Sequence, residues 1–193
     1  MTTLRPALAA AAAVACLAAA VPVHAATYAI DPTHTFVTFE IPHFGTSTNR
    51  GRFDKKTGSV QFDRAARTGK VEISIDTASI NTGVGPFNEH LRSKDFFDAA
   101  NHPTATFVAE RMVFDGDKVA EVPGRLTLRG RTHPVTLKAT NFNCYDNPMF
   151  KREVCGGDFV ATIKRSQFGV DWGLEMGFPD EVRLLVQVEA IKQ

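Results

Sequence analysis

The feature that most constrains the fold is a two-residue alternation of apolar and polar side chains, repeated along much of the chain. Residues 71–76 alternate Val, Ile and Ile with Glu, Ser and Asp, and residues 181–189 largely follow the same rule. Residues 126–129 and 135–140 also have this period. Because successive side chains of a strand point to opposite faces of a sheet, each segment is predicted to be a β-strand with one apolar face.

Four further segments are predicted as strands on weaker patterns: residues 35–41, 59–63, 104–114 and 159–165. Turn-forming Gly, Asp, Asn and Pro separate the strands, and neither an internal repeat nor a linker divides the chain. The sequence therefore predicts a single all-β domain of about eight antiparallel strands, which must close into a barrel or form a sandwich.

One segment departs from the strand pattern. Pro86 suits the first turn of a helix, and Phe87 and Leu91 share one helix face. Residues 86–97 are therefore predicted to contain a short helix followed by Phe96 and Phe97, or to form a loop with an apolar plug, and either could cover one barrel end. The pair Phe96 and Phe97 is expected to turn inward.

The first residues have the order of a secretory leader. Arg5 precedes an apolar run over residues 7–21, and small residues precede Ala26. Because the run is shorter than the ~18 residues that span a bilayer, we expect residues 1–25 to be a cleaved signal peptide. An uncleaved anchor and a lipoprotein attached through Cys16 are the alternatives. The mature domain would be residues 26–193, located in the periplasm, with no transmembrane segment after cleavage.

Cysteine content and charge narrow the function further. Cys144 and Cys155 remain after cleavage and are predicted to form a disulfide, because an exported chain favours oxidation and no neighbouring His or Cys-x-x-Cys spacing supports a metal site. The chain has 22 basic and 21 acidic residues, and loss of Arg5 with the leader makes it formally neutral. This balance gives no electrostatic basis for binding nucleic acid.

No motif for catalysis is present. The sequence lacks a Gly-x-Ser-x-Gly elbow, a Walker loop and a Rossmann glycine fingerprint, and its histidines have no tight metal-ligand spacing. We therefore expect no catalytic residues, no metal and no enzymatic activity. The alternative is a periplasmic haem-binding or metal-binding redox protein in which His34, His43 and His90 converge near one barrel end.

The apolar faces of the predicted strands would meet inside the barrel. Barrels of eight strands lie at the size limit where side chains either fill the interior or leave room for one small ligand, so a solid core is the alternative to a tunnel. The predicted tunnel wall is Val37, Phe39, Ile73, Ile75, Leu126, Leu128, Leu137, Ala161 and Leu184. The residues predicted to lie at a tunnel end are His43, Phe44, Phe96 and Phe97.

Several landmarks occur in one order along the mature chain. They include Ile30-Asp31 with His34, His43-Phe44-Gly45, His90-Leu91-Arg92-Ser93, Asp95-Phe96-Phe97-Asp98, Pro103-Thr104-Ala105-Thr106-Phe107, Leu126-Thr127-Leu128-Arg129-Gly130 and Arg165-Ser166-Gln167-Phe168-Gly169. In these landmarks the chain resembles the YceI-like lipid- or polyisoprenoid-binding family from Tyr28 to Ile191.

The resemblance implies an extended, lipocalin-like, eight-stranded antiparallel β-barrel with a long internal tunnel, exported to the periplasm. It implies carriage or sequestration of a long apolar lipid, namely a polyisoprenoid, an isoprenoid quinone or a fatty-acid-like chain. It also implies that there are no catalytic residues and no cofactor apart from this lipid, and it allows a homodimer.

Overall fold

The computed structural model describes residues 25–193, so the predicted leader lies outside the described residues except for its last position. Most of the described chain is strand. The strands are β1 (Ala26–Ile30), β2 (Phe36–His43), β3 (Ser47–Phe53), β4 (Lys56–Asp63), β5 (Thr68–Asp76), β6 (Ile80–Asn81), β7 (Thr104–Ala109), β8 (Val113–Asp115), β9 (Lys118–Leu128), β10 (Arg131–Asn147), β11 (Arg152–Lys164) and β12 (Glu181–Lys192). The helical segments are α1 (Gly85–Arg92) and the 3-10 turns η1 (Thr77–Ser79), η2 (Arg165–Phe168) and η3 (Leu174–Met176).

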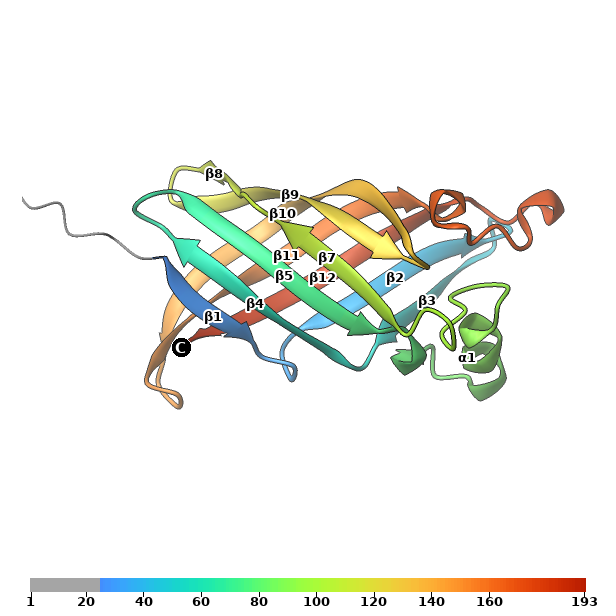
Figure 1. Ribbon diagram of the computed structural model, residues 1–193, viewed down its shortest axis with the longest axis horizontal. Coiled ribbons are helices and arrows are strands. Elements are labelled where there is room, and N and C mark those ends of the chain that lie inside the picture. The colour runs from blue at the N-terminus through green and yellow to red at the C-terminus, as the bar shows by residue number, and fades with distance from the viewer. Residues whose placement is uncertain (1–24) are drawn as a thin grey trace, which may run out of the picture.

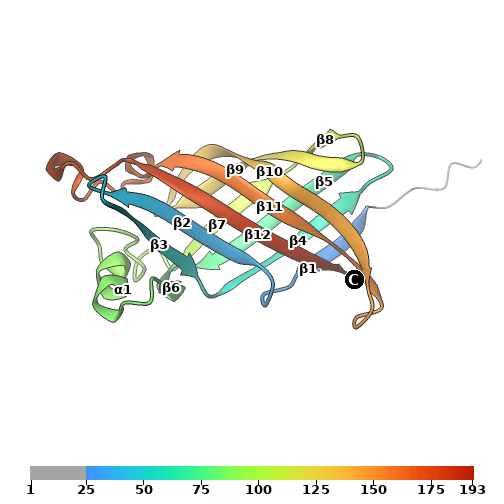
Figure 2. The same cartoon turned by 180° about the vertical axis from the view of Figure 1, so that it is seen from behind.

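These strands form one closed antiparallel barrel with eight strand positions. Four positions are interrupted strands, because β1 continues as β2, β3 as β4, β5 as β6 and β7 as β8 around short breaks. The barrel closes because β1 pairs with β4 on one side and with β12 on the other. Figures 1 and 2 show the strands running obliquely around a long axis. The predicted eight-stranded, extended, lipocalin-like barrel is confirmed.

The two ends of the barrel differ. One end, called here the helix end, carries α1, the β2–β3 turn and residues 165–180 (Figure 1). The opposite end, called the disulfide end, carries the β4–β5 and β10–β11 turns and the C-terminus (Figure 2). No helix in the described part of the chain has the length and apolar character required to cross a bilayer.

The short helix before Phe96 and Phe97 is confirmed. Pro86 lies in its first turn, and Leu91 is buried beneath it. Ser93 is extended, and its N–H donates to the carbonyl of His90, so the helix stops at Arg92. The chain then turns, and the N–H of Phe97 donates to Leu91. Phe96 and Phe97 therefore follow the helix in a turn, as the sequence predicts.

The disulfide end contains the confirmed Cys144–Cys155 bond. The two residues face each other directly across β10 and β11. Residues 147–157 showed no clear strand pattern in the sequence, yet only residues 148–151 lie between the strands. The apolar and polar alternation fails here because Gly156 and Gly157 carry no side chains.

Strand β3 was missed for a similar reason. Its inward positions are Asn49, Gly51 and Phe53, so the expected apolar face is mostly absent from the sequence. Gly51 is required because a Cβ there would lie 2.5 Å from the ring of Phe39. The inner face of β3 is thus completed by a side chain from the neighbouring strand β2.

Candidate functional site

The interior of the barrel is not filled by side chains. Two adjoining hollows remain, in which the centre of a water molecule can occupy about 120 Å³ and about 310 Å³ respectively. A single water needs ~10–15 Å³ by this measure, so both spaces exceed ordinary packing defects. The choice between a solid core and a hollow barrel is therefore settled in favour of a hollow barrel.

The smaller space, called the inner hollow, is enclosed by strands towards the disulfide end. Its wall consists of Tyr28, Val37, Val60, Phe62, Val71, Ile73, Ile75, Phe107, Met112, Val119, Val122, Leu126, Val135, Leu137, Phe142, Cys155, Gly156, Phe159, Leu184, Val186, Val188 and Ala190. Among these side chains, only the hydroxyl of Tyr28 is a strong hydrogen-bonding group. The inner hollow therefore suits a hydrocarbon chain.

The larger space, called the outer hollow, lies at the helix end. Its wall consists of Val37, Phe39, Ile41, His43, Asn49, Phe53, Ile75, Phe87, His90, Leu91, Phe96, Phe97, Ala105, Leu126, Leu128, Ile163, Arg165, Val170, Trp172, Phe178, Val182 and Leu184. Four of these side chains are polar or charged: His43, Asn49, His90 and Arg165. The outer hollow is thus mainly apolar but offers hydrogen-bond donors that the inner hollow lacks.

The two hollows meet at a waist. Both are lined by Val37, Ile75, Leu126 and Leu184, which come from four different strands. A chain passing from the helix end towards the disulfide end would cross between these four side chains. The waist is therefore the point at which a single substitution could divide the interior.

The predicted wall residues mostly lie where the sequence placed them. Those that line at least one hollow are Val37, Phe39, Ile73, Ile75, Leu126, Leu128, Leu137 and Leu184. Ala161 lines neither hollow and instead packs against the apolar cluster beside its strand partner Leu184. Contact between any of these side chains and a ligand stays a prediction.

Three of the predicted end residues, His43, Phe96 and Phe97, line the outer hollow. Phe44 does not, because its ring is 56% exposed and lies against the ring of Phe178 at a centroid distance of 4.7 Å. The reason is its position in the tight turn after β2, where a positive φ of 49° directs the chain away from the barrel interior.

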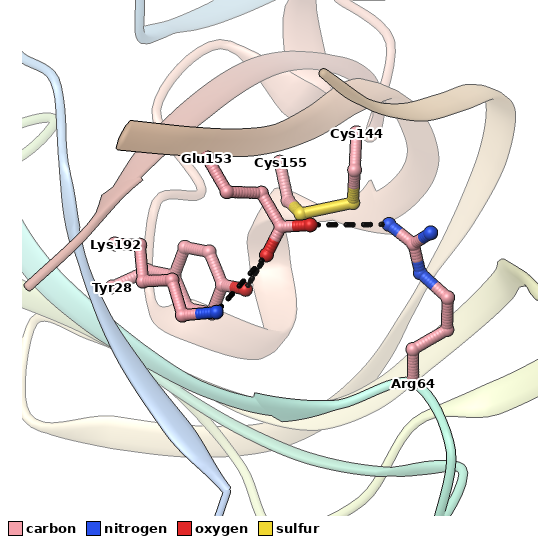
Figure 3. Close-up of a disulfide and its surroundings, with 6 residues drawn as sticks. All are labelled: Tyr28, Arg64, Cys144, Glu153, Cys155 and Lys192. Atoms are coloured by element: carbon pink, nitrogen blue, oxygen red, sulfur yellow. Dashed lines mark hydrogen bonds and ion pairs between the residues drawn. A yellow bond between two sulfur atoms is a disulfide. The ribbon is translucent and has the colours of Figure 1, made fainter. Parts of the chain in front are cut away.

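A polar cluster lies beside the disulfide and includes Tyr28 of the inner hollow's wall (Figure 3). The hydroxyl of Tyr28 donates to Glu153 at 2.5 Å, and the carboxylate also faces Lys192 at 3.5 Å and Arg64 at 3.6 Å. The hydrogen bond from Tyr28 and the two cations lower the pKa of Glu153, while burial and Glu153 raise the pKa of Tyr28. The one hydroxyl in the inner wall is thus already engaged.

The helix end is held together by Arg165. Its Nε donates to the carbonyl of Pro179 at 2.8 Å, and its Nη1 donates to those of Val170 at 3.0 Å and Trp172 at 2.8 Å. These bonds fix the segment that supplies Trp172 and Phe178 to the wall. Burial lowers the pKa of Arg165, but a guanidinium stays protonated in proteins.

Aromatic contacts connect the elements around the outer hollow. The ring of Trp172 lies 4.9 Å from His90, 5.3 Å from Phe96 and 5.7 Å from Phe178, measured between centroids. His90 belongs to α1, whereas Trp172 and Phe178 follow η2. These contacts hold the helix and the C-terminal segment together over one side of the hollow.

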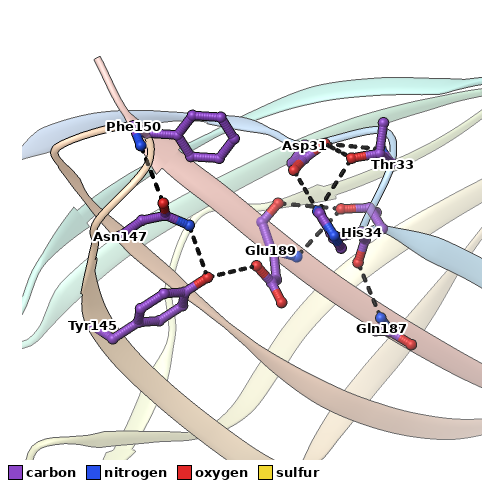
Figure 4. A network of polar contacts seen from close by, with 9 residues as sticks. Asp31, Thr33, His34, Tyr145, Asn147, Phe150, Gln187 and Glu189 are labelled. Atoms are coloured by element: carbon purple, nitrogen blue, oxygen red, sulfur yellow. Dashed lines mark hydrogen bonds and ion pairs between the residues drawn. The ribbon is translucent and has the colours of Figure 1, made fainter.

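The three histidines proposed for a metal or haem site do not converge, because one of them lies away from the other two. His43 and His90 line the outer hollow, whereas His34 lies in the loop between β1 and β2 and bonds Asp31 at 2.7 Å (Figure 4). Within residues 25–193, the one group of three potential ligands is Cys144, Glu153 and Cys155, and its sulfurs form the disulfide. The geometry does not favour the redox alternative.

Some wall residues were absent from the predicted set. Arg165 continues the inward parity of Phe159 and Ile163 in β11, so extending the alternation by one step would have found it. Trp172 and Phe178 lie in an irregular segment where no periodicity exists, so no pattern in the sequence marks them.

Comparison with known proteins gives one family. The model of the YceI-like domain matches residues 28–190, within the predicted barrel domain. A UPF0312 protein of Pseudomonas aeruginosa is 39% identical over 172 residues, and Protein YceI of Escherichia coli O157:H7 is 36% identical over 172 residues. Each alignment covers 88% of this chain and 88% of the relative.

Solved structures have the same fold. BcnA of Burkholderia cenocepacia matches with a TM-score of 0.71 and 29% identity, covering 83% of this chain and 98% of that one. A YCEI protein of Campylobacter jejuni matches with a TM-score of 0.70 and 27% identity, covering 79% and 90%. A polyisoprenoid binding domain from Saccharophagus degradans matches with a TM-score of 0.63 at 17% identity, covering 88% and 100%, and shows likeness of fold alone.

Proposed function

The chain belongs to the YceI-like family, and from this premise we propose that its barrel binds one long apolar lipid chain inside the two hollows. The observation that carries the proposal is the inner hollow, whose wall offers a ligand no free polar side chain. Water gains few hydrogen bonds in such a space, whereas a hydrocarbon chain loses none on entering it.

The energetics support useful affinity without a charged anchor. Burying about ten methylenes contributes ~8 kcal/mol before the cost of immobilising the ligand is subtracted. A polyisoprenoid, an isoprenoid quinone and a fatty-acid-like chain all provide this amount of apolar surface. The proposed role is carriage or sequestration of such a lipid, and the site contains no group assigned to catalysis.

We also propose that the protein works in the periplasm. The leader-like order of residues 1–25 supports export, and the Cys144–Cys155 disulfide suits an oxidising compartment. Cell fractionation of a bacterium that expresses the full chain tests this. Recovery of the protein from the cytoplasm with the leader attached would contradict it.

The proposed binding is tested by purifying the protein from a bacterial host without detergent and analysing organic extracts by mass spectrometry. We expect a lipid at close to one molecule per chain, which disappears from the native mass after delipidation and returns on incubation with the extract. An extract that matches one from an unrelated protein purified in the same way would contradict the proposal.

A further inference from the structure

The polar groups of the interior are distributed unevenly. At the disulfide end, Glu153 already pairs with Tyr28, Lys192 and Arg64. At the helix end, the outer hollow carries His43, Asn49, His90 and Arg165 in its wall. A lipid with one polar head group and one apolar tail therefore has a preferred direction in this barrel.

Arg165 stands out among these groups. It is only 5% exposed, and no carboxylate of the described chain lies within ion-pair distance of it. The nearby Asp180 uses its two oxygens to accept from the N–H and hydroxyl of Ser166 at 2.8 Å and 2.7 Å. The guanidinium therefore carries a buried positive charge whose bonds go to neutral carbonyl groups.

One nitrogen of this guanidinium, with its two N–H donors, has no partner. Nη2 of Arg165 is the single buried side-chain nitrogen or oxygen atom in residues 25–193 that has no hydrogen-bond partner. A buried charged donor without an acceptor is unfavourable, and native proteins rarely keep one without a role. Since Arg165 also forms part of the outer wall, an acceptor in the outer hollow is the natural partner for this atom.

We propose that the outer hollow holds the head group of the bound lipid and that Nη2 of Arg165 donates a hydrogen bond to an oxygen of that head group. This inference rests on the proposed lipid binding and adds a direction and a ligand class to it. The ligand is a long apolar chain that ends in an accepting oxygen, either a carbonyl or a carboxylate. Neighbouring atoms cover Nη2 in this structure, so the head group reaches it by displacing part of that cover.

The direction of the ligand is testable with the unmodified protein, because Trp172 is the only tryptophan and lines the outer hollow. The probes are two fatty acids of equal length, brominated either near the carboxyl group or near the methyl end. Bromine quenches indole fluorescence at short range. We expect the carboxyl-proximal bromine to quench Trp172 several times more strongly, and equal or reversed quenching would overturn the inference.

The role of Arg165 is tested with ligands of one chain length that end in a carboxylate, a methyl ketone or a plain methyl group. We expect the wild type to prefer each oxygenated ligand over the hydrocarbon by roughly tenfold to hundredfold. A stronger preference for the carboxylate would identify an anionic head group, and equal preference would identify a neutral carbonyl contact. Equal affinity for all three ligands would overturn the inference.

Variants separate a head-group contact from a structural role. Arg165→Lys also removes bonds that fix the segment around Trp172, so it should lower the affinity for all three ligands, but the affinity for the oxygenated ligands should fall at least severalfold more than that for the hydrocarbon. The matched control is Arg129→Lys, because Arg129 also donates to backbone carbonyls, those of Gly169 and Lys94, but lines neither hollow. The Arg129→Lys variant should keep the wild-type preference for the oxygenated ligands over the hydrocarbon.

If Arg165→Lys weakens every ligand equally, Arg165 acts only by holding the segment around Trp172, and the assigned contact is wrong. If the wild type binds none of the three ligands, the proposed lipid binding itself fails. The experiment therefore distinguishes failure of the head-group inference from failure of the proposed function.

Discussion

Asp31 is a buried carboxylate that fixes the loop between β1 and β2. It accepts hydrogen bonds from the N–H of Thr33 at 2.8 Å, from the Thr33 hydroxyl at 2.6 Å and from His34 at 2.7 Å. Burial alone would raise the pKa of Asp31, but the bonds from His34 and Thr33 outweigh it and lower the pKa from 3.8 to about 2. The same contact raises the pKa of the exposed His34.

These shifts give a pH-dependent stability. A carboxyl group whose pKa is lower in the folded state stabilises the protein at pH values above its unfolded pKa of 3.8. This stabilisation is lost as the pH falls towards 2. A histidine whose pKa is higher in the folded state stabilises the protein at pH values below its unfolded pKa of 6.5. This stabilisation is lost as the pH rises through the pKa of the folded state. The Asp31–His34 contact should therefore contribute most between about pH 4 and pH 6.

Asp31→Asn should lower the free energy of unfolding by about 2 kcal/mol at pH 5, because the shift of the Asp31 pKa corresponds to that amount. The difference from the wild type should shrink as the pH falls below 3.8 and approach zero only below pH 2, where Asp31 is protonated and as neutral as asparagine. Urea titrations across this pH range measure it. Asp117→Asn, in an exposed turn, is the control. If Asp31→Asn lowers the free energy of unfolding by the same amount at every pH, the charge of Asp31 plays no part in stability.

At the scale of elements, the alternation of apolar and polar residues identified strands where the inward positions carry apolar side chains. It found β5 and β12, because Ile73 and Ile75, and similar pairs, supply the inner face directly, but it found only the C-terminal end of β9. It failed at β3, where Gly51 makes room for Phe39. It also merged β7 and β8 into one predicted strand, because the break between them is only residues 110–112 and apolar residues resume directly after it.

The β10–β11 hairpin is the longest in the barrel, and the disulfide crosses it near its free end. Asn147 holds the turn by accepting from the N–H of Phe150 at 3.1 Å (Figure 4) and from the N–H of Met149 at 2.9 Å. Because Cys155 also lines the inner hollow, the disulfide stabilises strands that form part of the candidate site.

Replacing Cys144 and Cys155 together with alanine should lower the free energy of unfolding by roughly 3 kcal/mol, because the unfolded chain loses a cross-link that restricts it. Urea denaturation with and without a reducing agent measures this. Reduction should lower the free energy of unfolding of the wild type to nearly that of the variant, and it should leave the free energy of unfolding of the variant unchanged. Equal stability of oxidised wild type and variant would contradict the prediction.

At the scale of the whole molecule, the sequence predicted a closed barrel but not its hollow interior. The same alternating residues would suit a solid core, and the difference depends on how side chains from separate strands meet across the interior. The rim of the outer hollow was less predictable, because Trp172 and Phe178 come from an irregular segment. Periodicity places residues on a face, whereas an irregular loop is positioned by contacts such as the bonds from Arg165.

Blocking the waist should separate binding from stability. Val37→Trp fills the space between the hollows, whereas Thr38→Trp, the neighbouring residue on the opposite face of β2, is the matched control. Excluding three methylenes from the inner hollow removes about 2 kcal/mol of transfer free energy and should weaken binding of long chains by roughly thirtyfold. Titrations with long and short chains measure this, and an unchanged long-chain affinity would contradict a continuous path.

The most direct measurement is the contact between a bound chain and the inner wall. Protein with ¹³C-labelled methyl groups is saturated with an unlabelled long-chain lipid, and nuclear Overhauser effects are recorded from the lipid methylenes. We predict cross-peaks to Val71, Ile73 and Leu137, which line the inner hollow. Cross-peaks confined to methyl groups outside both hollows, such as those of Val84 and Leu185, would place the lipid on the surface and contradict the account.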